Sequence, residues 1–126
     1  PGYGFAKVSK AMIKSWQELI NEFFLSLNEK ILVCNIQDAR HPYQKSDQDF
    51  YDYIDPKSIN IFLIFNKVDK LKKQKERAAL NKVKKEIMKE FKGVMQIHYV
   101  SAETGEKCEE LEYALGSFLI QRSVIA

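Results

Sequence analysis

Residues 60–69 carry the pattern that decides the fold, Asn60-Ile61-Phe62-Leu63-Ile64-Phe65-Asn66-Lys67-Val68-Asp69. The apolar run has the length of one strand, and an unbroken run of this kind is typical of a strand buried in a parallel sheet. The run is too short to cross a bilayer. The polar residues that follow it would lie at the carboxyl end of the strand, where open parallel sheets bind ligands.

The sequence on both sides of this run alternates between helix-like and strand-like patterns. We expect helices over 9–27, 46–54, 71–91 and 108–121, and strands over 31–36, 60–65 and 95–100. Ser9 would cap the first helix, and Gly93 would end the third. This order predicts an α/β fold in which helices cover a parallel sheet, within a single domain over 1–126.

The same patterns predict which side chains face the core. We expect a buried strand over 31–36, with Cys34 inside its apolar run. The expected inward-facing residues of the first three helices are Ile13, Trp16, Leu19, Ile20, Phe23, Phe24 and Leu27, then Phe50, Tyr53 and Ile54, then Leu71, Ala78, Val83, Ile87 and Phe91.

The loops after the second and third strands contain the residue types that a guanine site requires. Asp69 can accept from both N1–H and the exocyclic amino group of guanine, whereas adenine would leave that carboxylate unpaired. Asn66 can bond the other edge of the base and tie the two loops together, while the Lys67 stem covers the ring face. A backbone N–H near Ala102 can donate to the guanine oxygen, and Ser101 can hold the shape of its loop.

Asn-Lys-x-Asp by itself is a short motif, and three features of its context favour the functional interpretation over a polar loop. It follows an apolar strand, a Ser-Ala motif follows the next strand, and the chain begins with Pro1-Gly2-Tyr3-Gly4. In GTPases an Asp-x-x-Gly segment of this kind places a glycine N–H on the γ-phosphate and begins switch II. Pro1 and Gly2 match its last two residues.

These motifs, together with Asp38-Ala39-Arg40-His41-Pro42 after the first strand, resemble the EngB/YsxC family of ribosome-biogenesis GTPases, in the translation-factor-like class of P-loop GTPases. The resemblance covers essentially the whole chain. It implies a cytoplasmic, magnesium-dependent GTPase that assists assembly of the large ribosomal subunit and is linked to septation. The family commonly has Thr at the position of Asn66 and a lysine near that of Glu103, so the chain departs from it there.

The resemblance also assigns roles to particular residues. Pro1, Gly2, Tyr3 and Gly4 would belong to the phosphate-binding switch II. The residues expected to surround guanine are Asn66, Lys67, Val68, Asp69, Val100, Ser101, Ala102 and Glu103.

A P-loop of the Gly-Lys-Ser/Thr type does not occur in the sequence, and Thr104 is its only threonine. We therefore expect the chain to be the C-terminal portion of a GTPase domain, from switch II to the last helix, with the Mg²⁺ ligands outside it. No catalytic residue is assigned, and we expect negligible GTP hydrolysis from this portion alone. Because Tyr3 stands where Ras-like proteins have glutamine, hydrolysis by the intact protein would be slow without a partner.

Basic residues are concentrated between Lys67 and Lys92, where eleven of them face four acidic residues and give a net charge of +7, against +3 for the whole chain. Such a run is usually a solvated helix face. It could also contact ribosomal RNA of the large subunit over 70–92. The alternative to the GTPase interpretation is therefore a basic RNA-binding α/β module without nucleotide chemistry. A receiver domain would need more acidic residues beside Asp38 than the sequence contains.

Asp38, Arg40 and His41 suggest either a catalytic group or a hydrogen-bonded turn, and the turn is favoured because no matched base and nucleophile accompany them. Cys34 and Cys108 suit a reducing cytoplasm better than a disulfide framework. The spacing of cysteines and histidines fits no zinc pattern. Neither a signal peptide nor a membrane span is expected. Oligomeric state stays open, since an exposed sheet edge could pair between copies.

Overall fold

The computed structural model describes residues 10–27, 31–54, 56 and 59–124. Its core is a parallel sheet of β1 (Leu32–Asp38), β2 (Asn60–Asn66) and β3 (Val94–Tyr99), in that order. β1 and β2 pair without interruption, so that Asp38 lies opposite Asn66 at their carboxyl ends. The predicted α/β fold with a parallel sheet is confirmed.

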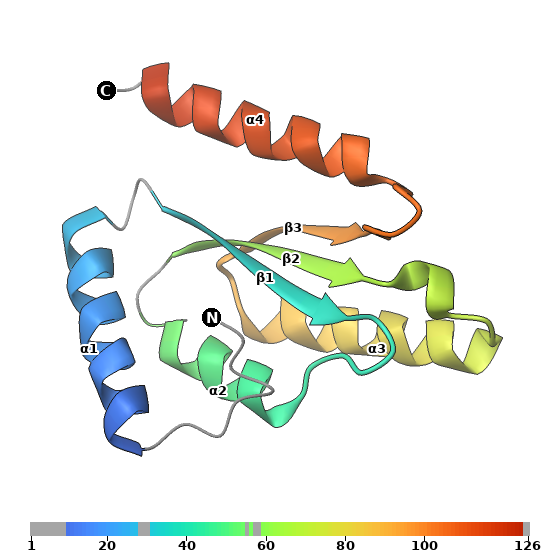
Figure 1. Ribbon diagram of the computed structural model, residues 1–126, viewed down its shortest axis with the longest axis horizontal. Coiled ribbons are helices and arrows are strands. Elements are labelled where there is room, and N and C mark those ends of the chain that lie inside the picture. The colour runs from blue at the N-terminus through green and yellow to red at the C-terminus, as the bar shows by residue number, and fades with distance from the viewer. Residues whose placement is uncertain (1–9, 28–30, 55, 57–58, 125–126) are drawn as a thin grey trace.

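Helices lie on both faces of this sheet (Figure 1). α2 (Lys45–Ile54) and α3 (Gln74–Glu90) pack on one face, and α4 (Cys108–Val124) lies over the other. α1 (Lys10–Leu27) runs beside α2, where the Tyr53 hydroxyl donates to the Gln17 carbonyl oxygen at 3.1 Å. Among the described helices, none has the length and apolar character needed to cross a membrane.

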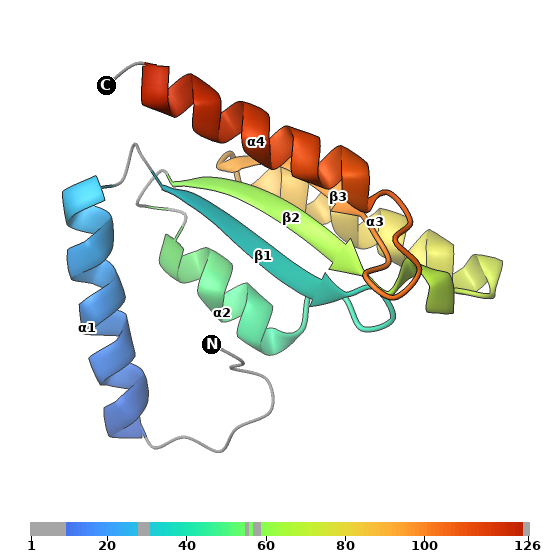
Figure 2. The ribbon, with the colours of Figure 1, turned by 45° about the horizontal axis from the view of Figure 1, so that its top comes forward.

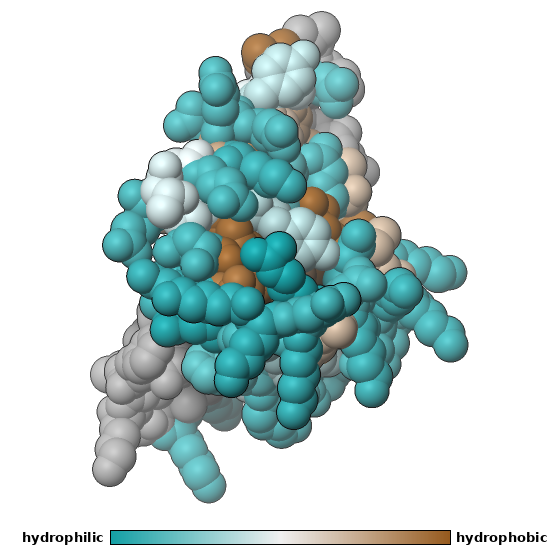
Figure 3. All heavy atoms as spheres, turned by 90° about the vertical axis from the view of Figure 1, so that its right-hand side faces the viewer, coloured by the Kyte–Doolittle hydropathy of each residue, from teal (hydrophilic) through white to brown (hydrophobic). Residues whose placement is uncertain are grey.

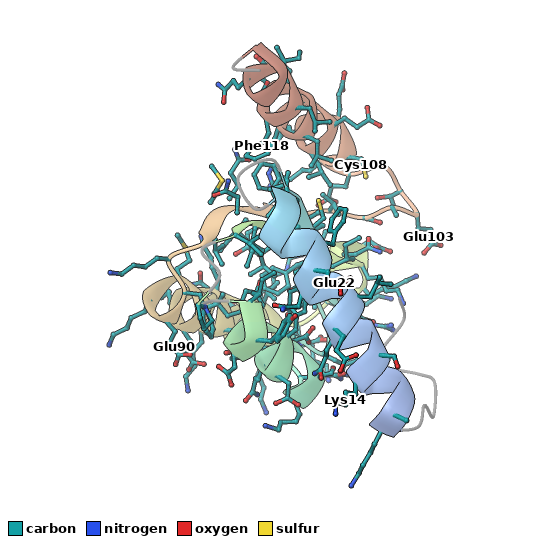
Figure 4. The ribbon with its side chains drawn as sticks, turned by 90° about the vertical axis from the view of Figure 1, so that its left-hand side faces the viewer. Lys14, Glu22, Glu90, Glu103, Cys108 and Phe118 are labelled. Carbon is teal, nitrogen blue, oxygen red and sulfur yellow. The ribbon has the colours of Figure 1, made fainter. Side chains whose placement is uncertain are left out.

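β2 is the centre of the core, and every residue of its apolar run is buried. Phe65 stacks on Tyr99 of β3 with ring centroids 5.6 Å apart. On the opposite face Phe62 meets Phe118 of α4 edge-on at 6.0 Å, and Figure 4 shows Phe118 pointing from α4 toward the strands. The expected strand over 60–65 with a buried apolar run is therefore confirmed, with Asn66 added to its end.

β1 differs from its prediction in both length and burial. The strand continues to Asp38 instead of ending at residue 36, because pairing with β2 persists to that point. Its buried side chains are the amides of Asn35 and Gln37, whereas Cys34 and Ile36 are exposed. The two amides are hydrogen-bonded to each other, since Gln37 Nε2 donates to Asn35 Oδ1 at 2.8 Å. The expected strand is present, and Ile31 and Val33 pack partly buried against the core, but the expectation that its apolar run is buried is wrong at Cys34 and Ile36.

The segment after β2 also differs from the expected helix over 71–91. A single 3₁₀ turn, η3 (Val68–Lys70), comes first, and α3 begins only at Gln74. The backbone N–H of Lys73 donates to Glu76 Oε1 at 3.1 Å, a capping interaction that fixes this start. Leu80 is buried in α3, whereas Ala78, predicted to face inward, is exposed.

Two further helix predictions need correction. Tyr51 of α2 was not predicted as a core residue, yet it is fully buried and stacks on Phe91 at 4.9 Å. Leu19 and Phe23 of α1 are exposed despite their apolar spacing. The predicted cap Ser9 lies outside the described residues.

Candidate functional site

The loops that follow the three strands gather at the carboxyl edge of the sheet (Figure 2). Backbone hydrogen bonds join them in sequence. The N–H of Ala39, after β1, donates to the Asn66 carbonyl oxygen at 2.8 Å, and the N–H of Val68, after β2, donates to the Val100 carbonyl oxygen at 3.2 Å. The parallel topology therefore brings together residues that are far apart in the sequence, and main-chain contacts hold them there.

The loop after β3 is organised around Ser101, which is fully buried. The Ser101 hydroxyl accepts from the Thr104 N–H at 3.1 Å, and its carbonyl oxygen accepts from the Gly105 N–H at 2.8 Å. Gly105 has a φ of 82°, a left-handed conformation that suits glycine. Ser101 thus holds the shape of the loop, as its residue type predicted.

Asn66 connects this loop to the end of β2. Its Oδ1 accepts from the Ala102 N–H at 3.0 Å, across 36 positions in the sequence. The expected link between the two loops is present. The same contact engages the Ala102 N–H, so the expected donor to the guanine oxygen near Ala102 would have to be a neighbouring N–H of this loop.

Asp69 lies in η3 with 17% of its side chain exposed. Its Oδ1 is buried and has no hydrogen-bond partner among the described residues. The Ser101 hydroxyl, and after it the Lys70 ammonium 3.6 Å from Oδ2, hold the pKa of Asp69 below its usual range. Asp69 is therefore an anion with one unsatisfied oxygen inside the loop cluster.

Lys67 has a left-handed backbone, with φ 68° and ψ 32°, which few residues other than glycine adopt. Strain of this kind persists where the surroundings impose it and is concentrated at functional sites. The Lys67 ammonium lies 3.5 Å from Asp38 Oδ2, on the neighbouring strand end.

Sequence reasoning took Asp38 and Arg40 as a structural turn and missed their proximity to Lys67. The Arg40 guanidinium donates a hydrogen bond to each carboxylate oxygen of Asp38, from Nε to Oδ1 at 3.1 Å and from Nη2 to Oδ2 at 2.8 Å. The hydrogen bond from the Arg40 side chain holds the pKa of Asp38 well below its usual range. In the structure Asp38 pairs with Asn66 across β1 and β2, and this register places Asp38 near Lys67. The register of two strands cannot be read from the sequence, so the contact between Asp38 and Lys67 was not predicted.

Other predicted residues stand apart from this cluster. Glu103 is exposed on its loop, 3.4 Å from Lys70 Nζ (Figure 4). Pro1, Gly2, Tyr3 and Gly4 lie outside the described residues. Within the described part of the chain, no three His, Cys, Asp or Glu side chains gather to bind a metal ion.

The end of the molecule that includes the carboxyl edge of the sheet is covered mainly by hydrophilic side chains, with a small apolar area among them (Figure 3). The basic residues of 70–92 contribute strongly to the charge of this part of the chain, and nearly all are exposed. Lys84 is the partly buried exception, with its ammonium 5.8 Å from the centre of the Tyr99 ring.

Two solved structures share this arrangement of helices and strands. An Aquifex aeolicus Era variant bound to GDP and AlF4⁻ matches with a TM-score of 0.63 at 23% identity, over 90% of this chain and 37% of that one. Apo translation elongation factor SelB from Methanococcus maripaludis matches with a TM-score of 0.61 at 21% identity, over 70% of this chain and 19% of that one. The domain therefore has the fold of P-loop GTPase domains.

Within that class, the chain is related in sequence to proteins named probable GTP-binding protein EngB, which confirms the resemblance. The protein of Natranaerobius thermophilus is 34% identical over 111 residues, and that of a Geobacillus species is 35% identical over 121 residues. These matches cover 88% and 94% of this chain but only 56% and 61% of the relatives. No family model matches the chain.

Proposed function

We propose that the chain is the guanine-reading part of a GTP-binding protein. The observation that carries this proposal is the buried Oδ1 of Asp69, which has no hydrogen-bond partner in the described structure. A buried oxygen that receives no hydrogen bond is unfavourable, so a ligand that supplies donors is favoured there. Guanine offers two adjacent donors, N1–H and the exocyclic amino group, and adenine does not.

The other residues expected around guanine have complementary roles. Asn66 positions the Ser101 loop through Ala102 and keeps its amide N–H groups for the base. Because the Ala102 N–H is engaged, we assign the donor to the guanine oxygen to the next residue, Glu103. Val68 and Val100 join the loops through their backbones. Lys67 covers the ring face with its stem.

The test is a titration of the isotope-labelled chain with GDP, ADP and xanthosine diphosphate, followed by NMR. GDP should shift the signals of residues 66–69 and 101–103, and ADP should not. Asp69→Asn should weaken GDP binding at least about tenfold, because a charged hydrogen-bond pair is worth about 1.5–3 kcal/mol. The same variant should gain affinity for xanthosine diphosphate, whose carbonyl can accept from the new amide.

Asp49→Asn provides a matched control, because it makes the same substitution at an exposed carboxylate of α2, paired with Lys45 and away from the loops. We expect it to change GDP affinity less than about 1.5-fold, as exposed ion pairs contribute little. Equal responses to GDP and ADP would contradict the proposal.

For the whole protein we propose a cytoplasmic GTPase that acts in assembly of the large ribosomal subunit and in septation, with Mg²⁺ accompanying GTP or GDP. The support is the relationship to EngB proteins together with the resemblance to ribosome-assembly GTPases. We place the Mg²⁺ ligands outside this chain, and we expect the chain alone not to hydrolyse GTP. The predicted role of Pro1, Gly2, Tyr3 and Gly4 at the phosphates remains part of this proposal.

The basic face of α3 supports ribosomal RNA of the large subunit as the partner. Charge reversal at the exposed Lys82, Lys85 and Lys89 should weaken binding to large-subunit RNA and flatten its salt dependence. Each lost phosphate contact lowers the slope of log K against log salt by about 0.7–0.9. RNA binding that persists in a chain indifferent to GDP would favour the alternative, an RNA-binding module without nucleotide chemistry.

A further inference from the structure

We infer that Asp38 is a positioning residue for guanine-nucleotide binding, because its carboxylate holds the Lys67 ammonium and so keeps the Lys67 stem over the base site. Asp38 touches no part of the base in this inference and acts through Lys67. The inference rests on the proposed function, since it assigns a role within the same site.

Contacts with Arg40 orient the Asp38 carboxylate independently of Lys67. Its Oδ1 accepts from the Arg40 backbone N–H at 2.9 Å and from Arg40 Nε at 3.1 Å, while Oδ2 accepts from Arg40 Nη2 at 2.8 Å. A planar guanidinium that bonds both oxygens sets the orientation of the carboxylate. The oxygen within 3.5 Å of the Lys67 ammonium is thus held in place by a neighbour on the same loop.

The main chain brings the two partners together. Asp38 pairs with Asn66 in the sheet, and the next N–H, that of Ala39, donates to the Asn66 carbonyl oxygen at 2.8 Å. Lys67 follows directly, in a left-handed conformation that limits where its side chain starts. In an exposed ion pair, the entropy lost when the two side chains are ordered usually offsets most of the Coulomb attraction. Here the backbone already supplies much of that order.

Lys67 is the member of the cluster that most needs such a partner. Its side chain has four methylene groups joined by rotatable bonds, and it is half exposed. Without Asp38 the ammonium would be released to solvent, and the stem would sample several rotamers. A guanine base that packs against the Lys67 stem would then have to order the stem on binding, and this entropic cost would weaken the affinity for the nucleotide.

The experiment is a double-mutant cycle on the GDP affinity of the chain, measured by NMR titration with Asp38→Asn, Lys67→Met and the double variant. Lys67→Met keeps an apolar stem and removes the charge. We expect Asp38→Asn to weaken GDP binding by about 3- to 10-fold, and we expect this effect to fall below about 1.5-fold in the Lys67→Met background. Asp38→Glu, which restores the charge, should recover part of the affinity.

The matched control is Asp49→Asn, which breaks the exposed Lys45–Asp49 pair of 2.8 Å on α2. GDP affinity should change less than about 1.5-fold in this variant. The amide spectra of all variants report whether the fold is retained, and Asp38→Glu serves if Asp38→Asn does not fold.

Two results would overturn the inference while leaving the proposed function intact. The first is an unchanged GDP affinity in Asp38→Asn. The second is an equal loss with or without the Lys67 charge, which would show that Asp38 shapes the loop and does not act through Lys67. A wild-type chain that does not bind GDP would overturn both proposals. The titration of the wild-type chain would reveal this before any variant is made.

Discussion

β1 and β2 are adjacent parallel strands of equal length, yet they use their side chains in opposite ways. β2 buries its whole apolar run, whereas β1 buries two amides and exposes Cys34 and Ile36. β2 is the middle strand and is covered on both faces, with Phe118 of α4 on one of them. The comparison shows that position in the sheet, and not hydropathy alone, decides which face of a strand is buried.

The buried amides of β1 contribute to the site. Gln37 Oε1 accepts from the Tyr43 N–H at 2.7 Å, beyond the turn that contains Asp38 and Arg40. Tyr43 has a φ of 54°, so this hydrogen bond holds the loop in an otherwise unfavourable conformation. β2 thus supplies most of the packing, and β1 uses its inner face to fix the loop that reaches Lys67.

The largest expected effect tests the packing of β2. Phe65→Ala removes a fully buried ring and its stacking on Tyr99, so it should lower the free energy of unfolding by about 3–5 kcal/mol. Ile36→Ala on β1, where the side chain is 62% exposed, should change it by less than about 0.5 kcal/mol. Urea unfolding followed by circular dichroism measures both. Equal losses would remove the contrast between the strands.

A smaller effect is expected for the polar interior of β1. Gln37→Leu has nearly the same volume but takes the acceptor from the Tyr43 N–H, and should therefore destabilise by about 1–3 kcal/mol. Gln121→Leu, at an exposed position of α4, is the control and should remain within about 0.5 kcal/mol. A stabilised Gln37→Leu variant would show that β1 prefers an apolar inner face after all.

The smallest effect concerns the pH dependence contributed by Asp38. The Arg40 side chain lowers the folded-state pKa of Asp38 below its unfolded value of about 3.9. The stabilisation is therefore present above about pH 4 and is lost as pH falls toward the folded-state pKa. Because the pair is partly exposed, Asp38→Asn should cost less than about 1 kcal/mol at pH 7.

This difference between wild type and Asp38→Asn should shrink below about pH 4, because the Asp38 carboxyl then takes up a proton in the unfolded state while it is still ionised in the folded state. Urea unfolding of both proteins at pH 7, 5, 4 and 3 measures it, and subtraction removes the contribution of Asp69. A difference that does not vary with pH would mean that the Arg40 contact adds nothing to folding.

Much of the architecture could be predicted from local pattern. The apolar run of β2, the alternation of helices and strands, and the position of 66–69 at a strand end all follow from residue types and spacing. The link from Asn66 to the Ser101 loop was also anticipated, because a side-chain amide between two loops has few other partners. The start of α3 was not anticipated, because η3 and the turn that follows it depend on hydrogen bonds with Val100 and Glu76.

Local chemistry alone is enough to predict that a carboxylate, an amide and a serine loop stand at the ends of two parallel strands, because spacing determines which residues share a strand end. Register and sheet position are tertiary properties. They turned Cys34 and Ile36 of β1 outward, and they placed Asp38 opposite Asn66 and within reach of Lys67. Pairing between strands is set by the whole sheet, so no residue of β1 carries that information by itself.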